Sequence, residues 1–268
     1  WKGNKRMIKL VASDIDGTLL PEGTAQINPE IFEVIRKLKE RDILFAAASG
    51  RHYTSMSKLF EPVKNDIIFI TENGAYVCCR GYTMLEQVLD WEQVCQWVRE
   101  VRRIPGTSFT LDTKEGFYTE SSDPEFLDLI RKGYRSRIDQ VEDALSRELK
   151  VNKMAVYRKE NIGEVARLLI PRWEDRLHCV ISGDVWVDFM NMDTNKGNAI
   201  RSIQKTLKIS PDETMVFGDN HNDLEMIRSA TESYAVGNAA EAVKKAAKYV
   251  ADTNVNDGVL KVLKTLLD

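Results

Sequence analysis

At both ends of this chain, short apolar runs alternate with segments of helical periodicity. The runs at 8–12, 43–48 and 67–71 predict strands. Between the first two, residues 28–38 predict a helix that begins with a capping Asn and a Pro in its first turn. Such alternation is typical of a parallel sheet with helices packed on it. We therefore predict an α/β fold.

The same pattern resumes after Lys196 and continues to the last residues. Each apolar run there is short enough for a buried strand, and each periodic segment is long enough for a helix. The predicted helices are 195–207, 223–229 and 259–267, and the predicted strands are 214–217, 233–236 and 249–251. The two ends of the chain are therefore expected to form one sheet.

The middle of the chain has a different pattern, because two of its strand candidates flank a polar loop that contains Gly116, which indicates a hairpin rather than a crossover. We interpret 83–187 as a second α/β domain inserted into the first, which comprises 1–82 and 188–268. Its predicted helices are 91–103 and 162–173, and its predicted strands are 107–111, 117–120, 153–157, 178–181 and 185–190.

Composition excludes several classes of protein. The net charge of −3 gives no electrostatic attraction to nucleic acid or to an anionic membrane surface, and no apolar run approaches the ~20 residues of a bilayer span. The stretch 1–9 lacks the apolar core of a signal peptide, and Met7 is the expected biological start. The four cysteines have no zinc-ligand spacing, so buried free thiols are expected. These features favour a soluble cytoplasmic protein.

The strongest chemical signal is the segment Asp14-Ile15-Asp16-Gly17-Thr18, directly after the first predicted strand. Ligands of open α/β sheets bind at the carboxyl ends of strands. Side chains at positions i and i+2 of an extended backbone lie on the same side, so the two carboxylates can converge on one substrate. Gly17 lets the chain turn away sharply.

Three further segments carry polar groups suited to an anion and a cation. Ser49-Gly50-Arg51 follows the second strand and offers a hydroxyl and backbone N–H groups. Lys196 begins a predicted helix, where its ammonium can meet phosphate oxygens near the positive end of the helix dipole. The segment 218–223, GDNHND, supplies the carboxylates and amides that a hard cation such as Mg²⁺ prefers.

Together these segments resemble the haloacid dehalogenase (HAD) superfamily, and within it the Cof-type sugar phosphatases. DIDGTLL at 14–20, SGR at 49–51, Lys196 with Gly197, and GDNHND at 218–223 are similar to the four family motifs in order and spacing. ENGA at 72–75, VGNA at 236–239 and DGV at 257–259 resemble lesser marks of the branch. The resemblance implies a Rossmann-like parallel-sheet core, the HAD fold, with an inserted α/β cap that selects the substrate.

The resemblance also implies roles for individual residues in a Mg²⁺-dependent phosphatase. Asp14 would be the nucleophile that forms an aspartyl phosphate, and Asp16 would protonate the leaving oxygen and then deprotonate water, which requires a raised pKa. Lys196 would offset charge in the transition state. The phosphoryl group would be bound by Ile15, Ser49, Gly50, Lys196 and Asn222. The metal site would comprise Asp14, Asp16 through its backbone carbonyl, Asp219 and Asp223, of which Asp223 orients rather than ligates.

The expected partner is a small phosphorylated metabolite, such as a sugar phosphate. A phosphomutase or phosphotransferase that uses the same aspartyl phosphate is the alternative, because transfer depends on cap residues that hold the acceptor. A receiver-like signalling domain is disfavoured, since it lacks an inserted cap and the segment corresponding to 218–223. Structural roles are expected for Arg51 and Asn73.

Overall fold

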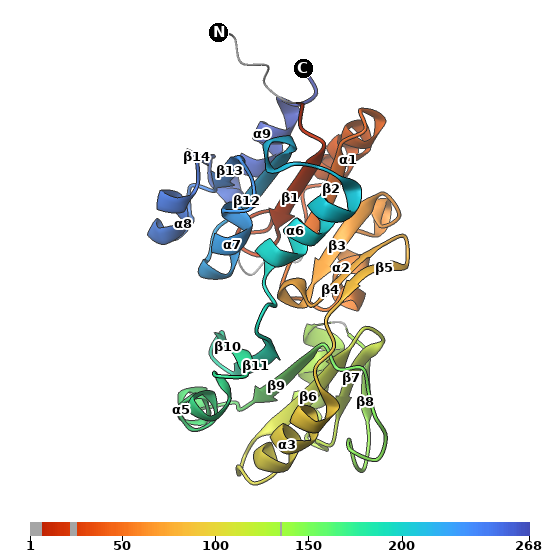
Figure 1. The fold of residues 1–268 in the computed structure, drawn as a ribbon, viewed down its shortest axis with the longest axis vertical. Helices are drawn as coiled ribbons and strands as arrows, with labels where there is room; N and C mark the ends of the chain where they lie inside the picture. The colour runs from red at the N-terminus through yellow and green to blue at the C-terminus, as the bar shows by residue number, and fades with distance from the viewer. Residues whose placement is uncertain (1–6, 22–25, 135) are drawn as a thin grey trace. The chain divides into compact units, whose positions relative to one another are not determined.

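The computed structural model describes residues 7–21, 26–134 and 136–268, so the residues before Met7 lie outside it (Figure 1). The chain forms two compact units. We call the first the core unit; its described residues lie within Trp1–Arg51, Met56–Leu85 and Asn195–Asp268. We call the second the inserted unit; its described residues lie within His52–Ser55 and Glu86–Thr194.

The core unit contains an eight-stranded sheet with the strand order β14-β13-β12-β1-β2-β3-β4-β5. The six strands from β14 to β3 run parallel, as the sequence predicts, whereas β4 pairs antiparallel with β3. The chain leaves β1 in one direction along the sheet through β2 and β3, and β12 to β14 continue in the other direction. The strands are β1 (Leu10–Asp14), β2 (Leu44–Ala48), β3 (Ile67–Thr71), β4 (Tyr76–Cys79), β5 (Tyr82–Glu86), β12 (Thr214–Gly218), β13 (Glu232–Ala235) and β14 (Tyr249–Val250).

The sequence accounts for the elements next to β1. All five residues of β1 are buried, as expected for a central strand covered on both faces. Helix α1 (Glu30–Glu40) buries Ile31, Val34, Ile35 and Leu38 at the predicted helical spacing. Its first backbone N–H, that of Glu30, donates to Asn28 Oδ1 at 3.1 Å, so the predicted capping residue acts one position before Pro29. The other helices here are α2 (Tyr53–Leu59, which spans the division between the units), α6 (Lys196–Leu207), α7 (Leu224–Ile227), α8 (Glu241–Ala246) and α9 (Gly258–Lys264).

The inserted unit has a six-stranded sheet of its own, in the order β10-β11-β9-β6-β7-β8. The predicted hairpin is confirmed, because β6 and β7 pair antiparallel. Strand β11 lies within this sheet and contains the expected domain boundary at 187. The strands are β6 (Ser108–Thr113), β7 (Gly116–Thr119), β8 (Ile138–Gln140), β9 (Lys153–Tyr157), β10 (Leu177–Ser182) and β11 (Trp186–Asn191).

Helices α3 (Trp91–Val101) and α5 (Ile162–Trp173) share one apolar core with this sheet. Trp97 of α3 lies at its centre, fully buried and edge-on to the rings of Phe109 and Phe189. A smaller cluster that includes Tyr157 and Trp186 packs with α4 (Pro124–Asp128) and a following π-helical turn, Leu129–Gly133. Each unit therefore has its own apolar core, as expected for a domain.

None of the helices that the structure describes has the length and apolarity of a bilayer span. The four cysteines are free thiols, as predicted, but only Cys78 is buried; Cys79, Cys95 and Cys179 are partly exposed. Cys79 ends a short strand near the edge of the sheet, where fewer side chains cover it, which the apolar pattern of the sequence does not reveal.

Candidate active site

The candidate site lies in the core unit, where β1 is flanked by β2 and β12 and the strand order changes direction. Asp14 is the last residue of β1 and is paired in register with Ala48, the last residue of β2. The next strand, β12, ends at Gly218, just before Asp219. The carboxyl ends of these parallel strands therefore bring three of the predicted motifs to one edge of the sheet, the usual position of ligand sites in such folds.

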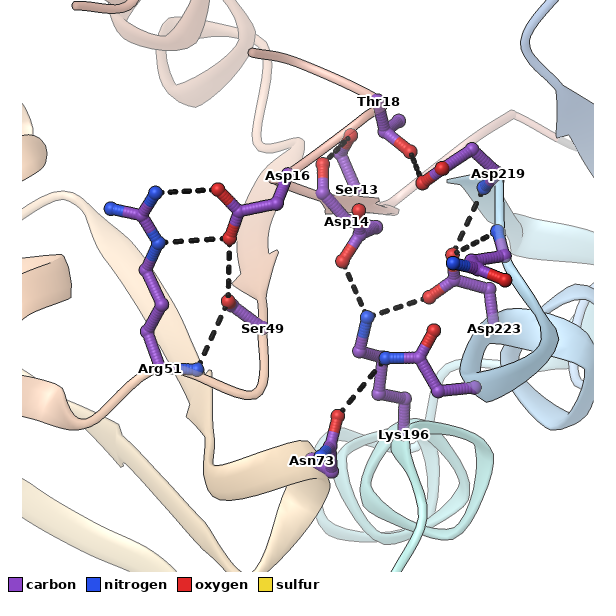
Figure 2. A network of polar contacts seen from close by, with 12 residues as sticks. Ser13, Asp14, Asp16, Thr18, Ser49, Arg51, Asn73, Lys196, Asp219 and Asp223 are labelled. Carbon is purple, nitrogen blue, oxygen red and sulfur yellow. Dashed lines mark hydrogen bonds and ion pairs between the residues drawn. The ribbon is translucent and has the colours of Figure 1, made fainter. Parts of the chain in front are cut away.

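Lys196, in the first turn of α6, contacts both the motif that contains Asp14 and the motif that contains Asp223. Asn195 caps that helix by accepting the backbone N–H of Asn198 at 2.8 Å, which fixes where the helix begins. The Lys196 side chain is completely buried, and its Nζ donates to Asp14 Oδ1 and to Asp223 Oδ1, the latter at 2.6 Å (Figure 2). A buried ammonium is stable only with such partners.

Asp223 has both of its oxygens engaged within the protein. Oδ1 accepts from Lys196, while Oδ2 accepts the backbone N–H groups of Asp219 at 2.9 Å and Asn220 at 3.1 Å. The carboxylate therefore fixes the loop after β12 and orients Lys196. Gly218 is required beside it, because a Cβ at that position would lie 2.6 Å from the Cβ of Asp223.

Asp219 faces the loop that follows Asp14. Its Oδ1 accepts from the Thr18 hydroxyl at 2.8 Å. Gly17 has a φ of +85°, and a Cβ there would lie 2.3 Å from Asp219 Oδ2. Only glycine allows both this backbone conformation and this close approach. The glycine of the first motif thus lets the loop contact the carboxylate of the fourth.

Three of the carboxylates are suited to a divalent cation. Asp14, Asp219 and Asp223 each offer an oxygen, and these oxygens lie within 4.8 Å of one another. Burial raises the pKa of Asp14 well above its usual value, the charge of Asp223 raises it further, and Lys196 partly offsets both effects. Burial also raises the pKa of Asp219. Three clustered carboxylates and one ammonium leave an excess of negative charge, and oxygen donors of this kind fit Mg²⁺.

Lys196 stays charged in this cluster. Burial lowers the pKa of its ammonium, but the attraction of Asp14 and Asp223 and their hydrogen bonds outweigh burial and raise it overall. A permanent positive charge therefore lies directly beside the Asp14 carboxylate.

Asp16 takes different partners from Asp14, although the two residues are only two positions apart. Its side chain is half exposed and forms a bidentate ion pair with Arg51, with Nε–Oδ2 at 2.8 Å and Nη2–Oδ1 at 2.5 Å. Ser49 Oγ donates to Asp16 Oδ2 at 3.4 Å, and the Arg51 backbone N–H donates to Ser49 Oγ at 3.1 Å. Figure 2 shows Asp14 pointing toward Lys196 and Asp16 pointing toward Arg51. The expected convergence of the two carboxylates is not seen in this arrangement.

A strained turn between β3 and β4 positions Asn73 beside the loop after β2. Glu72 and Asn73 have φ values of +48° and +53°, which are unfavourable for residues with side chains. The turn is held by two backbone hydrogen bonds, Glu72 N–H to Arg51 O at 3.1 Å and Asn73 N–H to Ser49 O at 3.0 Å. The Asn73 amide oxygen accepts from Asn222 Nδ2 at 3.2 Å.

Gly50 lies against the same asparagine, since a Cβ on Gly50 would be 3.1 Å from Asn73 Nδ2. The structure thus gives Asn73 a positioning contact with two residues expected to bind phosphate. The structural role expected for Asn73 agrees with these contacts.

The structure gathers the predicted residues into two neighbouring groups. Asp14, Lys196, Asp219 and Asp223 form one, and Asp16, Ser49 and Arg51 form the other. Ile15 has a buried side chain, and its carbonyl accepts the N–H groups of residues 18–20, so its side chain offers no polar contact to an anion.

Two asparagines from the C-terminal part of the chain hold the loop after Asp14 and are not predicted as site residues. Asn238 Nδ2 and Asn254 Nδ2 donate to the carbonyl of Gly17 at 2.8 and 2.9 Å. Asn238 lies in VGNA, which the sequence indicates only as a lesser motif. No local signal marks Asn254, because its partner is 237 positions away.

A family model described as haloacid dehalogenase-like hydrolase matches residues 11–263 of the chain. A relative from Escherichia coli strain K12, the 5-amino-6-(5-phospho-D-ribitylamino)uracil phosphatase YbjI, is 30% identical over 97% of this chain and 96% of its own length. A Bacillus subtilis strain 168 protein, the 5-amino-6-(5-phospho-D-ribitylamino)uracil phosphatase YcsE, is 27% identical over 96% of this chain and 95% of its own length.

Solved structures have the same fold. A crystal structure from Eubacterium rectale is 33% identical and superposes with a TM-score of 0.89, covering 97% of this chain and 99% of the other. The TM0651 structure from Thermotoga maritima is 24% identical, with a TM-score of 0.85 and 97% of each chain covered, which shows a shared fold.

Proposed function

Because this chain belongs to the haloacid dehalogenase-like hydrolase family, we propose that it hydrolyses the phosphate monoester of a small metabolite through an aspartyl phosphate on Asp14. The observation that carries this proposal is the buried contact between Lys196 and Asp14 at the end of β1. A carboxylate that is buried, paired with a permanent cation and placed at a strand end is suited to attack phosphorus. A fixed geometry, together with charge stabilisation in a site of low dielectric, lowers the activation barrier of this attack.

The reaction proceeds in two displacements. In the first, a carboxylate oxygen of Asp14 bonds to phosphorus, the ester P–O bond breaks, and Asp16 transfers a proton to the leaving oxygen. In the second, water attacks the phosphorus of the aspartyl phosphate, Asp16 accepts a proton from that water, and the bond to Asp14 breaks. Phosphate leaves, and both carboxylates return to their initial state.

Mg²⁺ is the proposed cofactor, held by Asp14, Asp219 and the backbone carbonyl of Asp16. When bound, it would neutralise the charge on the phosphoryl oxygens. Asp223 would orient these groups rather than bind the ion, because its two oxygens already accept from Lys196 and from two backbone N–H groups. The proposed metal site would thus use all four predicted residues in different capacities.

The phosphoryl oxygens would be bound by Ser49, the Gly50 N–H, Lys196 and Asn222, with any contribution from Ile15 coming from its backbone. Support comes from Asn73, which contacts Gly50 and Asn222 and so fixes the spacing between the loops after β2 and β12. We assign Asn73 as a positioning residue. Residues 83–187 are proposed as the domain that selects the substrate.

The substrate is proposed to be a phosphorylated sugar or sugar-alcohol derivative. Two relatives that match almost the whole chain are named for 5-amino-6-(5-phospho-D-ribitylamino)uracil, which carries its phosphate on a ribityl chain. This compound is therefore the first candidate. The four free thiols support a reducing compartment such as the cytoplasm as the place of action.

The test is phosphate release from a panel of phosphorylated metabolites that includes this compound, with and without Mg²⁺. Asp14→Asn is the matched variant, since it keeps the shape of the side chain and removes its charge. Release that requires both Mg²⁺ and Asp14 supports the proposal. Release that persists in Asp14→Asn contradicts it, and an isomerised product without free phosphate would favour the phosphomutase alternative.

A further inference from the structure

Arg51 and Ser49 form a group of donors suited to an anion, which we call the anion cradle, and the Asp16 carboxylate occupies it. Three donors converge on the Asp16 carboxylate: Nε of Arg51 at 2.8 Å, Nη2 of Arg51 at 2.5 Å and Oγ of Ser49 at 3.4 Å. A planar guanidinium with a neighbouring hydroxyl is an arrangement that also binds phosphate. Figure 2 shows this group beside Asp14 and Lys196, on the side away from Asp219.

The cradle is fixed by backbone hydrogen bonds and not only by the carboxylate that occupies it. The Arg51 backbone N–H donates to Ser49 Oγ at 3.1 Å and orients it. The backbone N–H groups of Glu72 and Asn73 donate to the carbonyls of Arg51 and Ser49, which ties this loop to the turn between β3 and β4. The left-handed residues of that turn show that the loop is held in place at a cost in backbone energy. The loop backbone and Ser49 Oγ would therefore stay in position if Asp16 moved away, and the Arg51 guanidinium, whose printed partner is Asp16, would be released to bind another anion.

We propose that Asp16 is an internal competitor for the phosphoryl group: it occupies Arg51 and Ser49 in the free protein, and the phosphoryl group of the substrate displaces it. The displaced carboxylate takes up a proton from solvent and can then donate it to the leaving oxygen, so substrate binding and placement of the acid are coupled. This inference rests on the proposed function and assigns Arg51, expected only to be structural, to binding the phosphoryl group.

The exposure of the pair makes the exchange feasible. The Asp16 side chain is 49% exposed and that of Arg51 is 33% exposed, so their attraction is screened by water. A phosphoryl dianion carries more charge than a carboxylate and offers more acceptor oxygens to the same donors. The phosphoryl group is therefore the stronger ligand of Arg51, and Asp16 gives up only a weak ion pair when it leaves.

A double-mutant cycle with inorganic phosphate as the probe tests this exchange, with Mg²⁺ present and binding measured by calorimetry. The four proteins are wild type, Arg51→Met, Asp16→Asn and the double variant. In wild type, the free energy that Arg51 contributes to phosphate binding is reduced, because its ion pair with Asp16 must break first. We expect Arg51→Met to weaken phosphate binding about fivefold more in the Asp16→Asn background than in wild type, the size expected for one partly exposed ion pair.

Arg51→Lys keeps the charge but not the two parallel hydrogen bonds, and it should restore part of the loss in the Asp16→Asn background. Arg80→Met controls for the loss of a positive charge, because Arg80 is an exposed arginine of the same unit that hydrogen-bonds the carbonyl of Asn65. An equal effect of Arg51→Met in both backgrounds, whether small or large, would overturn the exchange.

Turnover of the metabolite panel by the same wild-type preparation separates this inference from the proposed function. Turnover together with an equal effect in both backgrounds overturns the exchange alone. If phosphate binds neither wild type nor Asp16→Asn and no compound is turned over, both are overturned.

Discussion

Replacing Lys196 with Met removes the only ammonium that contacts the buried carboxylates of Asp14 and Asp223 among the residues the structure describes. Removing one partner of a buried ion pair leaves an uncompensated charge and costs about 3–5 kcal/mol of unfolding free energy. Lys9→Met is the matched control, because Lys9 pairs with Glu213 at 2.7 Å but is half exposed. An exposed pair contributes at most about 1 kcal/mol.

The loss in Lys196→Met should depend on pH. Without Lys196, the pKa of Asp14, already raised by burial and by Asp223, rises further. The folded variant then binds a proton that the unfolded chain, with a pKa near 3.8, does not bind. The stability present below pH 3.8 is therefore lost as the pH rises toward the folded pKa, with a slope of at most about 1.4 kcal/mol per pH unit.

The assay is urea unfolding of wild type and both variants at pH 5, 6 and 7 in the presence of a chelator. In parallel, kcat/KM of Lys196→Met with Mg²⁺ should fall by about 10²–10³, the usual effect of removing one group that stabilises the transition state. Equal destabilisation by Lys196→Met and Lys9→Met, or a loss that does not grow with pH, would refute the reasoning.

Three other changes have expected outcomes. Gly17→Ala places a Cβ against Asp219 in a left-handed conformation, so it should cost about 1–2 kcal/mol of stability and raise the Mg²⁺ concentration needed for half-maximal activity, read from a metal titration. Burial raises the pKa of Cys78 to about 12, so its alkylation at pH 8 should be about 10³-fold slower in the native protein than in urea, measured by peptide mass spectrometry; equal rates would contradict this burial. Burial lowers the pKa of His52, which hydrogen-bonds the carbonyl of Thr113, so its contribution is present above pH 6.5 and lost as the pH falls. The difference in unfolding free energy between wild type and His52→Gln should shrink from pH 7 to pH 5, and a constant difference would exclude this assignment.

Much of the fold could be predicted from the sequence, because buried strands and amphipathic helices have distinct apolar periods. The predicted bounds of β3, β9 and α5 match the structure. The apolar run predicts β1 at 8–12, but the strand spans Leu10–Asp14, because Asp14 continues the pairing with β2 although it is polar. The sequence pattern does not indicate the hairpin of β4 and β5, because β5 is partly exposed and mixed in polarity.

The candidate site was predictable where chemistry is concentrated in short motifs. The motif resemblance to the family is confirmed, and the four motifs supply both groups of the site. The partners of Asp16 were not predictable, since i and i+2 spacing suggests convergence with Asp14 and says nothing of an arginine 35 positions away. The same holds for Asn254, whose contact with Gly17 depends on the strand order of the folded sheet.

The central claim is that Asp14 carries the phosphoryl group during turnover. Wild-type protein and Asp14→Asn would be mixed with a turned-over substrate and Mg²⁺, quenched in acid within the first turnover, and digested for mass spectrometry. The account predicts a phosphoryl group on the peptide that contains Asp14 in wild type and none in the variant. Phosphate release by wild type without phosphorylation of that peptide at any quench time, or with the group on another residue, would contradict it.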